Sequence, residues 1–498
     1  MPGPSSTQRT FLGVLAAIAM LGLVLRGSGL AAGAWLLPVD YDEGVYFTAA
    51  SLLLRGELPY RDFVFVHPPG WPALLALTSA WLSPATGFAI ARWIAVLFGG
   101  LNIALVGVVA RRWLGPVAGL SAALFYATYP EVVAVERGPF LEPALNFACL
   151  AMTYFVSRAS ERGATRWAVA AGIAGGLALA IKLWAVAWLL GATWAIAAMA
   201  PRFRRAVALT SVLSAAGTFL LLVAPWVLAA PHDFMAQVIS FHLVRPPDGL
   251  TSIGARAEQL VAWRHLVSPL LALGAVSLGL ARRSPTGSPA GRVVTVAWLA
   301  FIASFLTARA YWSQYNSHLV ASEAILAGAL VSWLSTRLTR RAPRLVAGAL
   351  LVVAVALSLF SVHQRTTRST ALVDLAQRLA PLPADECVFA FEPAWTLAAG
   401  RLPPRVDGGL RVVDPYAVML DDAARSGVHF ASADDAFAEP LSAVRLRPLL
   451  ERCRHVVLGP RGRRQLNAEA MKWFQGTHTR TPPTSSDAEA LDVWSAGR

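Results

Sequence analysis

Long apolar segments recur through the first 362 residues, and they constrain the fold more than any other feature of this chain. A helix needs about 20 apolar residues to cross the hydrocarbon core of a bilayer. The chain is 56% hydrophobic and only 14% charged, whereas soluble domains are about 25% charged. Eleven segments are candidate spans: 11–25, 87–110, 116–134, 140–157, 167–181, 183–199, 206–229, 265–281, 293–308, 318–335 and 345–362. We therefore predict an all-α polytopic membrane domain over residues 1–362.

Many basic residues of this part lie in short clusters between apolar segments: 111–112, 158–166, 202–205, 282–283 and 337–344. Short arginine-rich loops are typical of the cytoplasmic side of a membrane protein. With the N-terminus in the cytoplasm, all these clusters fall on that side, which predicts a multi-pass protein of the cytoplasmic membrane. The net charge of +14 therefore does not indicate nucleic-acid binding, which requires a basic stripe on one soluble face.

The first external loop, residues 27–86, is rich in acids for this chain. Its central part, residues 38–70, contains Asp40, Asp42, Glu43, Glu57, Asp62 and His67. Charged groups beside hydrocarbon are costly, so an acidic cluster at a membrane surface indicates a functional site. The apolar stretch at 67–82 is too short to cross the bilayer, and we expect an interfacial or re-entrant helix there.

Asp42 and Glu43 are the first candidates for catalysis in this loop. A hydroxyl acceptor must lose its proton as it attacks, and a carboxylate within hydrogen-bond reach can act as that base. Alternatively, Asp42 caps the helix that follows, where an acid at the N-terminus is favourable. The two roles are compatible. We interpret Asp40 as a loop or turn acid.

Glu142 and Lys182 are candidates at the outer ends of later spans. Glu142 is either a second acid facing the same cavity or an acid that stabilises a helix end. Lys182 lies where two spans meet, and its ammonium either binds a phosphate or extends to the membrane surface from a helix end. The adjacent Glu136 and Arg137 could pair with each other.

Four more residues near the outer ends of spans could bind an anionic head group or leaving group: His67, Arg92, Arg309 and His318. Together they would place a positive pocket beside a negative one, as a donor phosphate and a reacting hydroxyl require. The sequence has no CxxC or HExxH spacing, so we predict no dedicated metal site and no cofactor. A divalent cation on the acidic loop remains an open alternative.

From about residue 363 the composition becomes mixed, and strand-like segments at 387–393 and 453–462 alternate with helix-like segments at 369–380 and 441–452. This pattern predicts a small α/β domain over residues 363–498, which is extracytoplasmic because an odd number of spans precedes it. Cys387 and Cys453 open the two strand-like segments. They would meet in neighbouring parallel strands and could form a disulfide in an oxidising compartment; the alternative is two buried thiols. Residues 479–490 are predicted to be a loop.

The loop also resembles a known family. Asp42 and Glu43 followed by Tyr46, then LLRGELPYRDF at 53–63 and HPPG at 67–70, are similar to the first external loop of the C-fold membrane glycosyltransferases. The resemblance is to the branch of protein O-mannosyltransferases and lipid A aminoarabinose transferases. ARW at 91–93, Glu142 and Lys182 are weaker matches.

The resemblance implies a C-type glycosyltransferase fold and inverting transfer of a sugar from a polyprenyl phosphate on the outer face. By residue match, Asp42 would be the base, Glu43 its neighbouring acid and Glu142 the second-loop acid. Lys182 and Arg92 would attend the donor phosphate, Tyr46 would contact the substrate, and His67 stands where related enzymes often have a lysine.

These features predict an inverting glycosyltransferase that moves a sugar, with mannose or a pentose favoured, from a polyprenyl-phosphate donor to a hydroxyl. Its partners would be that donor, membrane lipid and a cell-envelope glycan, glycolipid or protein acceptor. The first alternative is a glycolipid transporter or flippase, which would place ionisable residues near the bilayer midplane and often show inverted repeats. The second is a non-catalytic envelope assembly protein.

Overall fold

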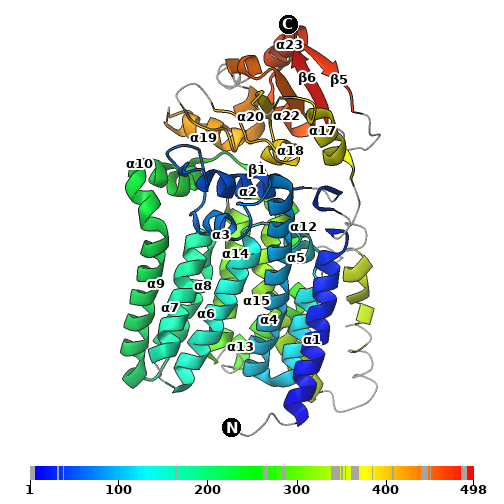
Figure 1. Cartoon of the computed structure of the whole chain (residues 1–498). Coiled ribbons are helices and arrows are strands. Elements are labelled where there is room, and N and C mark those ends of the chain that lie inside the picture. The colour runs from blue at the N-terminus through cyan, green and yellow to red at the C-terminus, as the bar shows by residue number, and fades with distance from the viewer. Residues whose placement is uncertain are drawn as a thin grey trace.

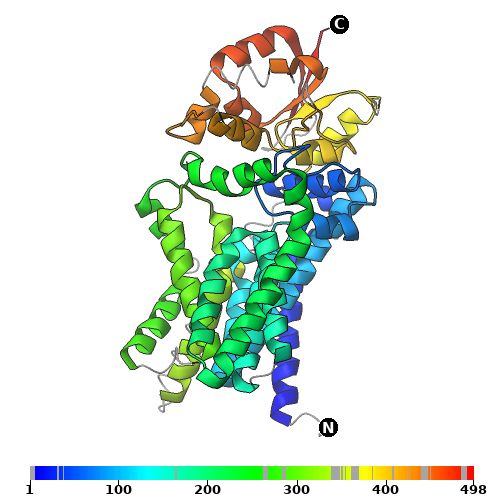
Figure 2. The same cartoon turned by 90° about the vertical axis from the view of Figure 1, so that its left-hand side faces the viewer.

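The structure is a computed structural model that describes residues 6–30, 33–36, 39–162, 165–261, 267–282, 288–337, 348, 352–353, 355–360, 369–383, 385–405, 409–425, 427–438, 447–448, 450–483 and 491–497. A bundle of long helices forms one end of the molecule, and the C-terminal residues form a separate layer on the other end (Figure 1). The N-terminus lies at the far end of the bundle from this layer (Figures 1 and 2).

The bundle is built from long helices that run between its two ends. They are α1 (Ser6–Gly27), α4 (Pro84–Thr128), α6 (Glu142–Arg162), α7 (Thr165–Ile181), α8 (Val186–Ala197), α9 (Pro201–Ala229), α13 (Val267–Arg282), α14 (Pro289–Thr307) and α15 (Asn316–Arg337). Within the bundle, α4 packs against α1 and α15, α7 against α6 and α9, and α8 against α14.

Among the described residues, five helices are long and apolar enough to cross a membrane: α1, α4, α9, α14 and Ser313–Arg337. The helices at 165–181 and 183–197 are apolar but shorter. Helix α4 contains two predicted segments, 87–110 and most of 116–134. Between them the backbone leaves the helical conformation at Leu114 and Gly115, which produces a kink. Half of the predicted segment 345–362 lies outside the described residues, so the count of eleven spans stays a prediction.

Helices α7 and α9 approach closely at two glycines of α7. A Cβ atom at Gly172 would lie 2.3 Å from the carbonyl oxygen of Ser211, and one at Gly176 would lie 2.5 Å from that of Ala215. A larger residue at either position would therefore push the helices apart. Small residues at such contacts let helix backbones pack closely in membranes, where the hydrophobic effect does not drive helix association.

Short elements connect the helices at the end of the bundle that faces the C-terminal layer (Figure 1). They are η2 (Ala34–Leu36), α2 (Tyr41–Leu53), α3 (Gly70–Thr78), α5 (Pro130–Val135), η3 (Leu183–Ala185), α10 (Pro231–Phe234), the π-helical turn η4 (Met235–Ser240), α11 (Phe241–Val244), β1 (Asp248–Gly249), α12 (Ile253–Leu260), β2 (Ala310–Tyr311) and η6 (Ser313–Tyr315). The short helix expected within 67–82 is thus present as α3.

The C-terminal part forms the predicted small α/β unit. Its helices are α17 (Ala371–Leu379), α18 (Pro393–Ala398), α19 (Pro415–Arg425), α20 (Ala433–Ala438), α22 (Pro460–Gln465) and α23 (Ala468–Thr477). Its sheet has the strand order β3 (Val388–Ala390), β4 (His455–Leu458), β6 (Asp492–Ala496) and β5 (His478–Thr481). Strands β3 and β4 are parallel, and the other two pairs are antiparallel.

Two sequence predictions for this unit have different outcomes. The strands expected at 387–393 and 453–462 pair in parallel as β3 and β4, and a disulfide joins Cys387 to Cys453 with an S–S distance of 2.00 Å. The loop expected over 479–490 was wrong at its start, because residues 479–481 continue strand β5 and pair with β6. Residues 484–490 lie outside the described part, as does most of the helix expected at 441–452.

The C-terminal unit is bound tightly to the acidic loop. The Arg411 guanidinium donates hydrogen bonds to the Glu57 carboxylate at 2.7 and 2.8 Å, and its backbone amide donates to the Asp62 carbonyl at 2.8 Å. The Tyr41 hydroxyl donates a hydrogen bond to Asp414. The loop is therefore enclosed between the helical bundle and the C-terminal unit, and this layering creates the cavity described next.

Candidate active site

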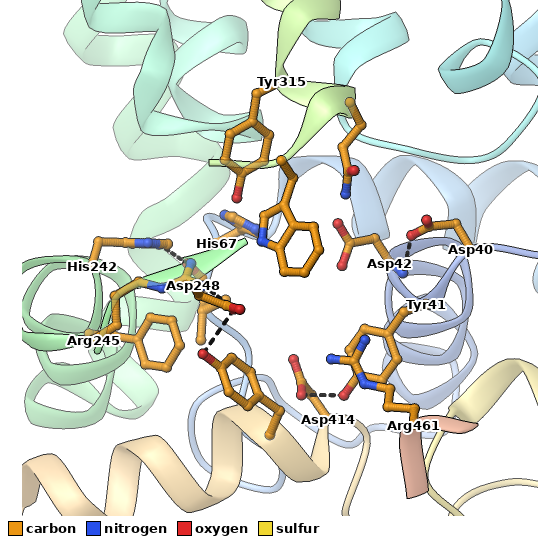
Figure 3. A pocket seen from close by; sticks show the side chains of 15 residues that line it. Asp40, Tyr41, Asp42, His67, His242, Arg245, Asp248, Tyr315, Asp414 and Arg461 are labelled. Atoms are coloured by element: carbon orange, nitrogen blue, oxygen red, sulfur yellow. Dashed lines mark hydrogen bonds and ion pairs between the residues drawn. The ribbon is translucent and has the colours of Figure 1, made fainter. Parts of the chain in front are cut away.

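A cavity of about 160 Å³ lies between the bundle and the C-terminal unit. Four parts of the chain line it: the acidic loop, the segment that follows α9, the segment between α14 and α15, and the C-terminal unit (Figure 3). Its lining residues are Asp40, Tyr41, Asp42, Val66, His67, Phe241, His242, Arg245, Asp248, Trp312, Gln314, Tyr315, Asp414, Tyr416 and Arg461.

Helix α2 positions the acidic wall of the cavity. Asp40 is its N-cap, and its carboxylate accepts a hydrogen bond from the Asp42 amide at 3.0 Å. The Glu43 carboxylate accepts one from the Asp40 amide at 3.1 Å, which completes a capping box. The suggestion that Asp42 caps this helix was therefore wrong. Asp40, interpreted as a turn acid, is the cap, and it fixes Asp42 in the first turn.

The Asp42 carboxylate faces the cavity and makes no hydrogen bond or ion pair with a described residue (Figure 3). Burial, together with the neighbouring carboxylates of Asp40 and Glu142, raises the pKa of Asp42 to about 7. A carboxylate with this pKa changes protonation state near neutral pH, as a general base requires.

The opposite wall carries His67, His242 and Arg245 (Figure 3). The two imidazole rings stack with centroids 5.5 Å apart, and His242 Nε2 lies 2.8 Å from the Val66 carbonyl oxygen. Burial lowers the pKa of His67 well below its usual value and that of His242 to about 4. Both imidazoles are therefore neutral at pH 7, and Arg245 supplies the positive charge on this wall.

Arg245 is held by Asp248, with 3.1 Å between Nη2 and Oδ2, and Asp248 also accepts a hydrogen bond from the Tyr416 hydroxyl at 3.0 Å. The Arg245 Nε atom is buried without a hydrogen-bond partner among the described residues. The Arg245 side chain keeps 12% of its surface exposed and lines the cavity, so a ligand in the cavity can contact it. Tyr315 also lines the cavity (Figure 3).

Glu142, Lys182 and His318 form a buried cluster behind Tyr315. Lys182 Nζ lies 2.7 Å from Glu142 Oε1 and 3.2 Å from His318 Nε2, and 5.1 Å from the centroid of the Tyr315 ring. Lys182 is only 5% exposed, so the suggestion that it extends to the membrane surface was wrong. The structure thus brings these three predicted residues together. The Lys182 ammonium, however, is paired with Glu142, and Lys182 is not among the residues that line the cavity.

The other predicted site residues lie in different surroundings. Glu43 forms a buried ion pair with Arg92, with 3.0 Å between Oε2 and Nε, so these two bind each other behind the cavity wall. Tyr46 is buried, and its ring centroid lies 5.8 Å from that of His67. Arg309 is exposed and donates a weak hydrogen bond to the Arg245 carbonyl oxygen at 3.4 Å.

Sequence reasoning missed several residues of the cavity, above all Arg245, Tyr315, Asp414 and Arg461. Arg245 had a usable signal, because it is a basic residue in a loop assigned to the outer side, against the usual distribution of arginine. The C-terminal residues had none, since nothing in their local sequence indicates which part of the bundle they contact. Within the described residues, no group of three or more His, Cys, Asp or Glu side chains could hold a metal ion.

Comparisons with known proteins show the fold, together with a family match over part of the chain. Residues 66–228 match the family model of the dolichyl-phosphate-mannose-protein mannosyltransferases. No curated protein sequence matches the chain. Among solved structures, ArnT from Cupriavidus metallidurans, bound to undecaprenyl phosphate, is similar with a TM-score of 0.65 and 16% identity over 99% of this chain and 100% of its own.

A second similar structure is the archaeal oligosaccharyltransferase AglB from Archaeoglobus fulgidus, in complex with an inhibitory peptide and a dolichol-phosphate. Its TM-score is 0.64 with 12% identity, over 99% of this chain and 75% of that one. The bundle and the C-terminal unit are both included in these alignments. The resemblance inferred from the loop motif is thus confirmed, and this chain has the C-type fold of the membrane glycosyltransferases.

Proposed function

We propose that this protein is an inverting glycosyltransferase that moves a sugar from a polyprenyl-phosphate donor to a hydroxyl group of a cell-envelope acceptor. One observation carries the proposal: the Asp42 carboxylate, which has no partner among the described residues, faces the Arg245 guanidinium across one cavity. A base for the acceptor and a cation for the leaving phosphate are the two groups that such a transfer needs.

The geometry supports a single displacement. The acceptor oxygen forms its bond to the anomeric carbon while its proton passes to Asp42, and the bond from that carbon to the phosphate oxygen breaks. The phosphate leaves with the bonding electron pair, and the Arg245 guanidinium stabilises the charge. Attack on the face opposite the phosphate inverts the anomeric configuration.

Two buried ion pairs, Glu43 with Arg92 and Glu142 with Lys182, stabilise the position and the charge of Asp42 in this proposal. Glu43 and Arg92 hold the first turn of α2, and with it the position of Asp42. Glu142 and Lys182 lie close enough to Asp42 to influence its charge in opposite directions, the first favouring the protonated form and the second the ionised form. We assign them to tuning the base, with Lys182 and His67 as further groups near the donor phosphate.

The proposed location is the outer face of the cytoplasmic membrane. The end of α6 and the starts of α7 and α9, which carry the arginines of 158–166 and 202–205, lie at the end of the bundle opposite the C-terminal unit (Figure 1). The positive-inside rule assigns that end to the cytoplasm. The cavity and the disulfide-bonded C-terminal unit would then be extracytoplasmic, where disulfides persist.

The test is transfer by the purified protein in nanodiscs, with radiolabelled polyprenyl-phosphate sugars, mannose and pentoses first, and total cell envelope as acceptor. We expect label in the envelope fraction with inverted anomeric configuration. Movement of labelled glycolipid across the bilayer without donor consumption would instead establish a transporter. If the protein showed neither transfer nor transport, the non-catalytic assembly role would be the remaining interpretation.

The pKa of Asp42 leads to a prediction of pH dependence. A base with a pKa of about 7 is mostly protonated at pH 6. The transfer rate should therefore fall about tenfold for each pH unit below the pKa and level off above about pH 8. Initial rates between pH 5 and 9 at saturating donor would show this limb. A flat profile over this range would exclude Asp42 as the titrating base.

Arg245 gives a prediction about the donor. Replacing it in Arg245→Gln removes a charge-assisted contact to the phosphate and should raise the donor KM by about tenfold or more. The acceptor KM should stay nearly constant. The matched control is Arg425→Gln, which removes an arginine paired with Asp233 on the surface. Equal donor KM values in both variants would contradict the assignment.

A further inference from the structure

Arg461 is a cavity residue that the proposed reaction does not use. It lies in the first turn of α22 in the C-terminal unit and reaches back to the start of α2, where its guanidinium carbon lies 3.5 Å from the centroid of the Tyr41 ring. Figure 3 shows it beside Tyr41 and Asp414, on the same side of the cavity as Asp42. The C-terminal unit thus contributes a cation next to the proposed base.

The guanidinium of Arg461 has an unused donor. Its Nε atom is buried and has no hydrogen-bond partner among the described residues. A buried donor without a partner carries a desolvation cost, which a ligand oxygen in the cavity would offset. Stacking on Tyr41 fixes the plane of the guanidinium, and the side chain lines the cavity where a ligand would lie.

The charges around Arg461 restrict which ligand fits. The carboxylates of Asp40, Asp42 and Asp414 line the cavity around Arg461, while Arg245 lies on the opposite wall. An anionic acceptor group would be repelled by three carboxylates, whereas a hydroxyl can accept from Arg461 and donate to a carboxylate at once. Two neighbouring neutral hydroxyls fit these charges, because one can react at Asp42 while Arg461 and Asp414 bind the other.

We propose that Arg461 and Asp414 bind the hydroxyl next to the reacting one, and that the acceptor is therefore a neutral glycan with a vicinal diol. This inference rests on the proposed function and specifies its acceptor. The reacting hydroxyl loses its proton to Asp42 as its oxygen bonds to the anomeric carbon and the phosphate leaves with the bonding pair. The adjacent hydroxyl accepts from Arg461 and is not altered.

The first test uses the wild-type protein and an acceptor that has lost its vicinal diols. Cell envelope is treated with periodate and then with borohydride, which cleaves vicinal diols but leaves phosphates, carboxylates and isolated hydroxyls such as those of internal serine or threonine. We expect transfer to fall at least about tenfold relative to mock-treated envelope, since a ligand that lacks the bound hydroxyl leaves buried polar groups unpaired. Unchanged transfer would overturn the glycan assignment and point to a protein or an anionic lipid acceptor.

The second test compares Arg461→Gln with Arg463→Gln. Arg463 is two residues further in the same helix but pairs with Asp492, which Arg480 also contacts. We expect Arg461→Gln to raise the acceptor KM about tenfold with the donor KM and the slow release of free sugar to water unchanged, and Arg461→Lys to recover part of the loss. A rise in the donor KM instead, or equal acceptor KM values in the two glutamine variants, would overturn the role of Arg461. Failure of the wild type to transfer to untreated envelope would overturn the proposed function itself and this inference with it.

Discussion

Asp42→Asn is expected to lower the transfer rate by a factor of about 10² to 10⁴ while the protein stays folded. Asparagine has nearly the same shape as aspartate but cannot take the proton of the acceptor hydroxyl. The Asp42 carboxylate makes no hydrogen bond or ion pair with a described residue, so its loss removes no structural contact. The measurement is the initial rate of label transfer from the donor that the wild type uses, beside the thermal unfolding midpoint of the same sample.

The matched control for this change is Asp233→Asn. Asp233 is a partly exposed acid at the same end of the bundle, where it pairs with Arg425, and it is not among the cavity-lining residues. We expect its transfer rate and midpoint to equal those of the wild type. An Asp42→Asn protein with wild-type activity would remove Asp42 from the role of base, and loss of the folded state in that variant would show that the carboxylate is structural.

The acidic loop shows what sequence reasoning can reach. Carboxylates beside an apolar span are costly, and that rule led to Asp42, which indeed lies at the cavity. The same rule grouped Glu43 with it, although the next residue on a helix points in another direction. The partner of Glu43 is Arg92, 49 residues away, and the loop sequence contains no sign of that pairing.

The C-terminal unit shows the same limit at longer range. Alternating strand and helix patterns, with a cysteine at the start of each good strand, were sufficient to predict the parallel pair and the bridge between Cys387 and Cys453. They could not predict that Asp414 and Arg461 would line a cavity with Tyr41, because docking depends on surfaces that only the folded units present. Local patterns thus gave the elements, and the contacts between distant elements gave the site.

The buried pair of Arg26, in the last turn of α1, and Glu136, directly after α5, shows the same limit within the bundle. The sequence left open that Glu136 pairs with its neighbour Arg137, but Arg137 donates to the Leu25 carbonyl and to Ser28 instead. Glu136 accepts hydrogen bonds from Arg26 Nε at 2.6 Å, Tyr126 Oη at 2.7 Å and Asn102 Nδ2 at 2.8 Å. Arg26 and Glu136 are both 0% exposed. One carboxylate therefore connects α1 with the two parts of α4 on either side of its kink.

Removing that carboxylate should have the largest effect on stability. Glu136→Ala leaves the Arg26 charge buried without its partner and is expected to cost about 3–5 kcal/mol of unfolding free energy. The double change Arg26→Met with Glu136→Ala should cost clearly less than the sum of the single changes, because it removes the unpaired charge as well. Glu451→Ala is the control, since its pair with Arg447 is half-exposed and such pairs contribute about 0–1 kcal/mol. Denaturant unfolding in one detergent would measure all of these, and a Glu136→Ala protein as stable as Glu451→Ala would show that the pair does not hold α1 to the bundle.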